Sequence, residues 1–299
     1  MTEGRDSERW VPLALTGAIV AISFAALFFK QAAPTHPLVV AGTRLAFAAV
    51  ILAVPTARAW RAGRLPRRVW KVAIACGVLY GLHFGTWVTS LSMTSVASSV
   101  TLVTATPLLL ALLSLATRRD RPRPRHWVSI GLALIGLTLI GWADLSLSAD
   151  ALLGDGLALV GAAAMAFYLL LVRSLGKDLD VLAFSGLATG FGALTLLIAA
   201  LLTGVPIEYA SVGSVGWIAL SALVPQLIGH NLLTWSLRHA TPTAVGIATI
   251  GEPVGATLLA WIWLGESVTP WVGVGCAITL CAVVVALDPR RRRPAAERV

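Results

Sequence analysis

The chain has 299 residues, of which 57% are hydrophobic and only 12% are charged, and its mean hydropathy is +0.83. Soluble domains average about 45–50% apolar and about 25% charged residues. This composition excludes a soluble globular protein, so the net charge of +9 has to be explained in a membrane setting.

Ten apolar segments follow one another along the chain and are joined by short connections. Each has about 20 residues, which is enough to cross roughly 30 Å of hydrocarbon as a helix. The sequence therefore predicts an all-α integral membrane protein with ten transmembrane helices. The predicted spans are residues 11–33, 37–57, 69–91, 95–117, 126–144, 153–175, 181–204, 213–236, 241–264 and 269–287.

Basic residues alternate from one connection to the next. The connections after the second and fourth spans and the C-terminus carry Arg58, Arg61, Arg64, Arg67, Arg68, Lys71, Arg118, Arg119, Arg121, Arg123, Arg125 and Arg290–Arg293. The connections on the other side carry no Lys or Arg and hold Asp144, Asp150, Glu208 and Glu266. Positively charged connections stay in the cytoplasm. We therefore expect both termini to be cytoplasmic, in a bacterial-type inner membrane, and we expect no nucleic-acid partner.

The two halves of the sequence resemble each other. Pro107 matches Pro253 at an offset of 146, His83 matches His230 at 147, and Trp87 matches Trp235 at 148. A half contains five spans, and because five is odd the second half must enter the membrane from the opposite side. This is the inverted-repeat architecture of many secondary transporters. We expect a first repeat over residues 1–148 and a second over 149–299, enclosing a central cavity.

Three features stand out in this duplicated sequence: Arg44 in the second span, Gly-Glu-Pro at 251–253, and WLGESVTPWVGVG at 263–275. They resemble motifs of the drug/metabolite transporter superfamily, in particular of its EamA-type ten-helix exporters. The first half departs from the pattern, because Ala-Thr-Arg-Arg-Asp at 116–120 stands where an acidic Leu-Gly-Glu stretch is expected. Within the group the chain is similar to the YddG-type amino-acid exporters. The resemblance implies export of amino acids or related metabolites.

Pro107 and Pro253 lie near the middle of the fourth and ninth spans. A proline removes one backbone hydrogen bond, and in a membrane the freed carbonyl needs another partner or a wet cavity. Paired breaks in corresponding helices are a sequence marker of a transport site, so both prolines are candidates for a helix break that takes part in gating. The alternative is a kink that only serves packing.

Glu252 lies at the same depth as Pro253. An acid at the centre of a membrane helix costs about 2.5–3.5 kcal/mol on insertion scales, so we expect it to be protonated or to face water in a cavity. It is our candidate for coupling protons to transport and for binding a substrate amino group. The alternative is a protonated side chain that donates one hydrogen bond to a neighbouring helix. Thr106 stands at the equivalent place of the first half.

Tyr80, His83 and Trp87 fall on one face of the third span, within about 60° of each other. This stripe favours a cavity for an amphipathic or aromatic solute, and a packed aromatic face is the alternative. Further candidates for substrate binding are Gln226 and His230, four residues apart in the eighth span, and Tyr168, Ser98 and Thr101. The two hydroxyls are weak candidates, because hydroxyls in membrane helices often bond their own backbone.

Arg44 lies deep in the second span. It is expected either to be structural, bonding helix-end carbonyls, or to bind a substrate carboxylate. Gly81, Gly85, Gly131 and Gly246 are expected to allow close helix contacts.

These features together predict a secondary transporter that exports amino acids, such as aromatic or other large neutral ones, by alternating access. A multidrug or other small-metabolite exporter is the alternative, and an intramembrane enzyme is a distant one, because paired acids, metal-ligand clusters and nucleotide loops are lacking. We expect no cofactor and no bound metal. The expected partners are a small-molecule substrate and the lipid bilayer. A monomer suffices, since one chain contains both halves.

Overall fold

The computed structural model describes residues 2–94, 96–116, 122–141, 148–177, 179–265 and 268–287. Eight helical segments in these residues are long and apolar enough to cross a membrane, and two shorter apolar helices, Pro124–Ile140 and Pro270–Ala286, occupy the fifth and tenth predicted positions. The predicted all-α membrane fold is thus confirmed. The basic residues at 118–121 and 290–293, together with Asp120, Asp144 and Glu266, lie outside the described residues.

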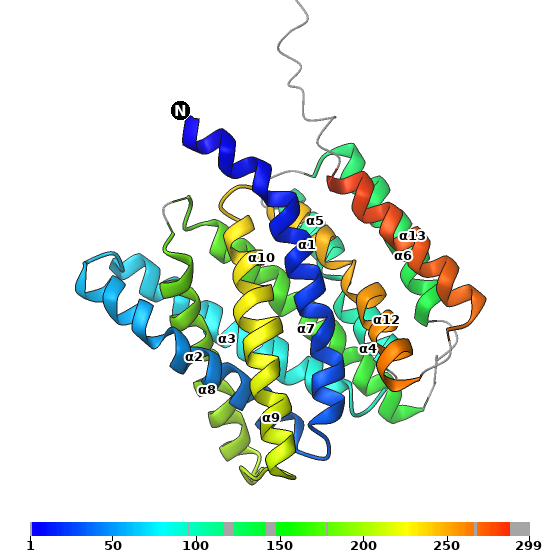
Figure 1. The fold of residues 1–299 in the computed structure, drawn as a ribbon, viewed down its shortest axis with the longest axis horizontal. Helices are drawn as coiled ribbons and strands as arrows, with labels where there is room; N and C mark the ends of the chain where they lie inside the picture. The colour runs from blue at the N-terminus through cyan, green and yellow to red at the C-terminus, as the bar shows by residue number, and fades with distance from the viewer. Residues whose placement is uncertain are drawn as a thin grey trace, which may run out of the picture.

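The described residues of the first half form α1 (Thr2–Gln31), α2 (Pro37–Arg61), α3 (Arg67–Ser90), α4 (Val96–Val103), α5 (Thr106–Ala116) and α6 (Pro124–Gly141) (Figure 1). The second half contains α7 (Ala149–Arg173), α8 (Val181–Leu202), α9 (Val212–Ser221), the π-helix η2 (Ala222–His230), α10 (Asn231–Ser236), α11 (Pro242–Thr249), α12 (Glu252–Leu264) and α13 (Pro270–Leu287). Three spans are therefore composite. We call α4 with α5 span 4, α9 with η2 and α10 span 8, and α11 with α12 span 9.

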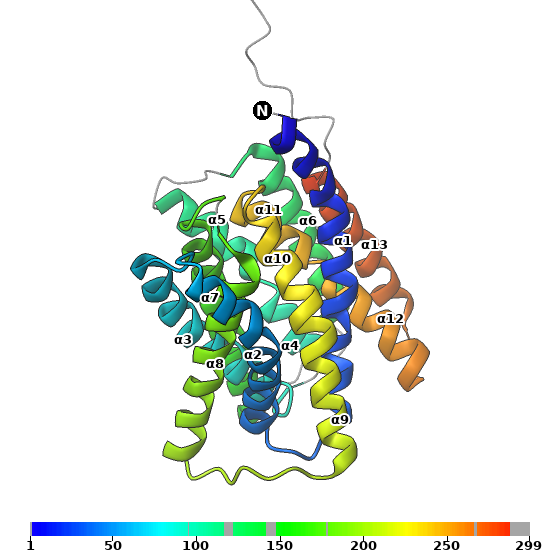
Figure 2. The same cartoon turned by 60° about the vertical axis from the view of Figure 1, so that its left-hand side comes forward.

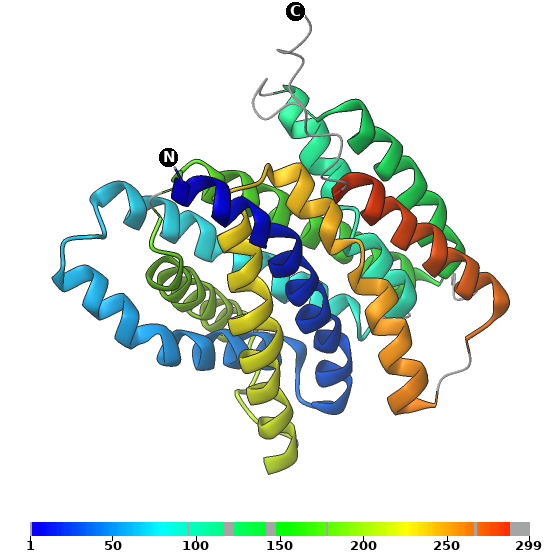
Figure 3. The same cartoon turned by 45° about the horizontal axis from the view of Figure 1, so that its top comes forward.

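The two halves pack against each other along nearly every span. Helix α2 lies along α8, and α6 lies along α13 at one edge of the molecule (Figures 1 and 3). Helix α1 packs on all parts of span 8, and α7, its counterpart in the second half, packs on α3. Exchanging the two halves exchanges these last two contacts, as an inverted repeat requires.

The helix connections gather at two ends of the bundle. The connections after α2, α7 and α10 meet at one end, where the Arg64 side chain pairs with Asp180 at 2.7 Å and Arg238 Nε donates to the Lys177 carbonyl at 2.6 Å. We call this the basic end. The connections after α1 and α8 meet at the opposite end, where Ala210 N donates to Thr35 Oγ1 at 3.0 Å (Figure 2, lower edge).

A π-helix distinguishes span 8 from its counterpart in the first half. Helix α3 is a continuous α-helix, whereas its counterpart, span 8, contains nine residues of π-helix. A π turn bonds residue i to i+5 and so holds about one residue more than an α turn. The π-helix ends at His230, so the change of offset from 147 at His230 to 148 at Trp235 falls after it, within α10.

Small residues mark the close helix contacts. A Cβ added to Gly81 or Gly85 would meet Thr195 or Leu196 of α8 at 2.8 Å, and one on Gly246 would meet Leu110 at 2.7 Å. The expectation for Gly131 is wrong, because a Cβ there would meet nothing within 4 Å. The close contact on α6 is made instead by Gly136, whose added Cβ would lie 2.7 Å from the carbonyl of Gly275.

Candidate functional site

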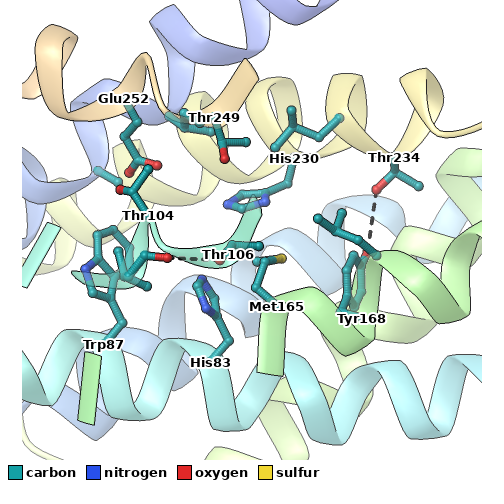
Figure 4. Close-up of a pocket in the computed structure, with 15 residues that line it drawn as sticks. His83, Trp87, Thr104, Thr106, Met165, Tyr168, His230, Thr234, Thr249 and Glu252 are labelled. Carbon is teal, nitrogen blue, oxygen red and sulfur yellow. Dashed lines mark hydrogen bonds between the residues drawn. The ribbon is translucent and has the colours of Figure 1, made fainter. Parts of the chain in front are cut away.

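A cavity of about 50 Å³ lies inside the bundle and is lined by residues of α1, α3, α7 and spans 4, 8 and 9. This volume holds roughly three or four water molecules. The wall combines apolar side chains such as Ile22, Met165 and Leu233 with polar ones. The polar lining consists of His83, Trp87, Thr104, Thr106, Tyr168, His230, Thr234, Thr249 and Glu252 (Figure 4).

Span 4 is interrupted beside this cavity. Helix α4 ends at Val103 and α5 begins at Thr106. Pro107 has no N–H to donate to the carbonyl of Val103, four residues back. The hydroxyl of Thr106 donates to that carbonyl instead, at 2.9 Å. In the first half, the carbonyl left free by the proline thus receives a hydrogen bond from a side chain in the same helix turn.

Span 9 is interrupted at the equivalent place. Helix α11 ends at Thr249, α12 begins at Glu252, and the Gly251 N–H bonds the Ala248 carbonyl at 3.1 Å in the tight turn between them. Pro253 leaves the carbonyl of Thr249 without its helical donor. The two breaks face the same cavity, through Thr104 and Thr106 in one half and through Thr249 and Glu252 in the other.

Five of the residues predicted from the sequence line the cavity: His83, Trp87, Tyr168, His230 and Glu252. Glu252 is half-buried, and Figure 4 shows it with Trp87 on one side of the cavity, while Tyr168 and Thr234 lie on the other side. The hydroxyls of Tyr168 and Thr234 are 3.5 Å apart.

His83 is held in a defined orientation. Its Nδ1 lies 2.9 Å from the carbonyl of Gly161 on α7. A carbonyl only accepts hydrogen bonds, so Nδ1 carries the hydrogen, and in the neutral ring Nε2 is an acceptor. The ring stacks on Trp87 at 5.9 Å between centroids.

Tyr80 and Gln226 form the wall behind the lining residues. The Tyr80 ring stacks on Tyr168 with centroids 4.3 Å apart and an interplanar angle of 2°. Its hydroxyl accepts a hydrogen bond from Gln226 Nε2 at 3.3 Å. Both side chains are buried, and neither is among the residues that line the cavity. They support Tyr168 rather than face the cavity themselves.

Arg44 is fully buried one layer behind the cavity. Its guanidinium lies over the rings of Phe84, at 4.3 Å, and Phe29, at 5.1 Å. None of its three nitrogens has a hydrogen-bond partner within the described part of the chain. The carbonyl contacts expected of a structural arginine are therefore replaced by two cation–π contacts.

Ser98 and Thr101 do not line the cavity. The Ser98 hydroxyl donates to Asp155 Oδ1 at 2.8 Å and so ties α4 to α7. Thr101 Oγ1 is buried and has no hydrogen-bond partner among the described residues. Both face helix contacts rather than the cavity.

The cavity also includes residues that sequence reasoning missed, among them Thr104, Thr234, Thr249 and Met165. Thr104 and Thr249 lie three and four residues before Pro107 and Pro253. This spacing in the sequence could have identified them as residues of the helix breaks. Thr234 directly precedes Trp235 of the repeat. Nothing in the sequence distinguishes Met165 from other apolar residues of its span.

A larger cavity of about 700 Å³ opens at the basic end. It is lined by Arg64, Asp180 and Arg238 together with the half-buried Trp235 and several leucines. Thr234 lines the central cavity and its neighbour Trp235 lines this one. The two cavities are therefore adjacent along α10.

The EamA-like transporter family matches the chain over residues 9–142 and 152–287. The uncharacterized transporter YwfM of Bacillus subtilis (strain 168) is 24% identical over 230 residues, covering 76% of each chain. The uncharacterized transporter YetK of the same organism is 25% identical over 208 residues, which are 67% of this chain and 60% of YetK, so the match spans about three fifths of that relative.

A protein crystal structure shares the fold, with a TM-score of 0.74 and 19% identity over 93% of this chain and 96% of its own. The family match covers both halves separately, as the duplicated architecture requires, and it confirms the resemblance seen in the sequence motifs. The chain is a multi-pass membrane protein that belongs to the EamA-like transporter family.

Proposed function

We propose that this protein exports amino acids, in particular aromatic and other large neutral ones, from the cytoplasm by alternating access. The single observation that carries the proposal is the meeting of two helix breaks, one from each half, at a cavity that contains Glu252. Secondary transporters with inverted repeats place their substrate sites at such breaks near the middle of the membrane.

Access from the basic end supports the direction of transport. The positive-inside rule assigns that end to the cytoplasm and both termini with it, in an inner membrane. The 700 Å³ cavity lies at this end, next to the central cavity. At the other end of α3 the buried Trp87 packs edge-on against Phe29, with centroids 5.6 Å apart. We interpret the conformation as inward-facing, that is, closed on the outer side and open toward the cytoplasm.

The lining supports an amphipathic solute. His83, Trp87 and Tyr168 offer ring faces, and Met165 offers a flexible apolar contact. The central cavity holds only a few waters, so a large amino acid requires these side chains to move apart. We assign Glu252 to proton coupling and Pro107 and Pro253 to the gating breaks. His83, His230 and Tyr168 are the other titratable groups among the described residues that line the cavity with Glu252.

Purified protein in liposomes tests the proposal. Efflux of labelled phenylalanine is measured with and without a pH gradient, alongside glycine and a hydrophobic cation. We expect phenylalanine efflux that responds to the gradient, and we expect Glu252→Gln to abolish that response. Glu208→Gln, an exposed acid at the opposite end, is the matched control and should leave the response unchanged. Transport of the hydrophobic cation alone would instead establish the multidrug alternative.

A further inference from the structure

The two helix breaks are equivalent in position, but they differ in the hydrogen bonding of the backbone carbonyl four residues before the proline. In the first half the Thr106 hydroxyl donates to the carbonyl of Val103, which Pro107 has left without its helical partner. In the second half Pro253 leaves the carbonyl of Thr249 in the same situation. The residue in the place of Thr106 is Glu252, whose ionised side chain accepts hydrogen bonds and donates none.

The second break therefore gathers acceptors. Thr249 and Glu252 both line the cavity. Helix α11 ends at Thr249, so the partial negative charge of its C-terminal end adds to the carboxylate. Backbone carbonyls freed in a membrane need a donor, and unwound carbonyls at half-helix ends serve as cation ligands in secondary transporters. A protonated amino group, with three N–H donors and one positive charge, fits these acceptors.

A donor without a partner belongs to a residue that lines the same cavity. The indole nitrogen of Trp87 is buried and has no hydrogen-bond partner among the described residues. The side chain is 3% exposed, lines the cavity, and lies on the same side of it as Glu252 (Figure 4). An indole N–H can only donate, and leaving it unpaired costs free energy. A carboxylate oxygen of a ligand is the partner that this group lacks.

We propose that the break of span 9 is the head-group site for an α-amino acid. The ammonium group lies between the Glu252 carboxylate and the Thr249 carbonyl, and the substrate carboxylate accepts from Trp87 Nε1. The substrate side chain then extends across the cavity toward Met165 and Tyr168. The proposal rests on the proposed function and deepens it, since it assigns each end of the substrate to a named group.

Binding of three labelled ligands to the purified protein in nanodiscs tests the site. Phenylalanine has both head groups, phenethylamine has only the amine, and 3-phenylpropionate has only the carboxylate. Glu252→Gln is expected to weaken phenylalanine and phenethylamine by about tenfold or more and to leave 3-phenylpropionate within about twofold. Trp87→Phe is expected to weaken phenylalanine and 3-phenylpropionate and to spare phenethylamine.

A matched pair of proline variants tests the backbone carbonyl. Pro253→Ala restores an N–H that can bond the Thr249 carbonyl, so it should weaken phenethylamine by a factor of about five to ten. Pro55→Ala also restores an N–H inside a membrane helix, but in α2, which contributes no residue to the cavity lining, and it should leave phenethylamine binding within about twofold.

Equal weakening of phenethylamine by both proline variants would overturn the site, as would a uniform loss of all three ligands in Glu252→Gln. Failure of the proposed function is a separate result, seen when wild-type liposomes move no amino acid. Binding of phenethylamine in nanodiscs is measured independently of transport in liposomes. The ammonium site is therefore tested even when no amino acid is transported.

Discussion

Tyr80 of α3 and Tyr168 of α7 stack face to face, with ring centroids 4.3 Å apart and planes inclined by 2°. The contact joins the two halves of the chain at the wall of the central cavity. Tyr80 is anchored by Gln226 of span 8, and the Tyr168 hydroxyl lies 3.5 Å from that of Thr234. One ring pair therefore links α3, α7 and span 8 next to the cavity at the basic end.

Removing the Tyr168 ring is expected to destabilise the protein. Tyr168→Ala deletes a buried aromatic side chain and leaves a cavity, at a cost of about 3 kcal/mol. Tyr168→Phe keeps the stack and loses only a long hydroxyl contact, at a cost of about 1 kcal/mol or less. Thermal unfolding in detergent distinguishes the two variants. Equal melting temperatures for Ala and Phe would show that the stack contributes little.

The contact between α6 and α13 is expected to depend on Gly136. Gly136→Ala places a methyl group against Gly275 and Thr279, where overpacking costs about 1–3 kcal/mol. Gly131→Ala, one and a half turns earlier on α6, meets nothing within 4 Å and serves as the control. The melting temperature of the first variant should fall and that of the second should not. Because Ala favours a helix more than Gly does, a similar fall in both would show that the close contact at Gly275 is not the cause.

Arg44 offers a test of what a buried cation contributes. Replacing a buried charge by an apolar side chain of similar length is often neutral or stabilising by about 1–4 kcal/mol. Arg44→Met should therefore melt at the same temperature as the wild type or higher. The same variant should transport phenylalanine poorly, because the positive charge one layer behind the cavity is gone. Normal transport together with a lowered melting temperature would show that Arg44 is purely structural.

The orientation in the membrane is tested by labelling single cysteines. In a chain with Cys76, Cys276 and Cys281 replaced by Ala, the exposed positions Ala62 and Glu208 are each changed to Cys. An impermeant maleimide added to intact cells should label Glu208→Cys and reach Ala62→Cys only after the membrane is opened. Labelling of both positions in intact cells would contradict the proposed topology.

Much of the site was visible in the sequence, because it depends on chemistry that is rare in a membrane. Pro107, Pro253 and Glu252 stand out against an apolar background, and His83, Trp87, Tyr168 and His230 are polar-tipped rings at mid-span depth. All but the two prolines line the cavity. Tyr80 and Gln226 belong to the same helix faces but lie one layer back. Periodicity gives the direction of a side chain and not its distance from a cavity.

The sequence by itself determined the membrane location, the number of spans and the duplication, because hydropathy and repeat spacing are properties of the chain. Only the tertiary structure decided which hydroxyls face the cavity, that span 8 contains a π-helix, and that Arg44 lies against Phe29 and Phe84. These outcomes depend on contacts between residues far apart in the chain. The carbonyl of Val103 receives the Thr106 hydroxyl, whereas Thr249 shares its cavity with the acid Glu252, and this difference between two equivalent breaks appears only when both halves are folded together.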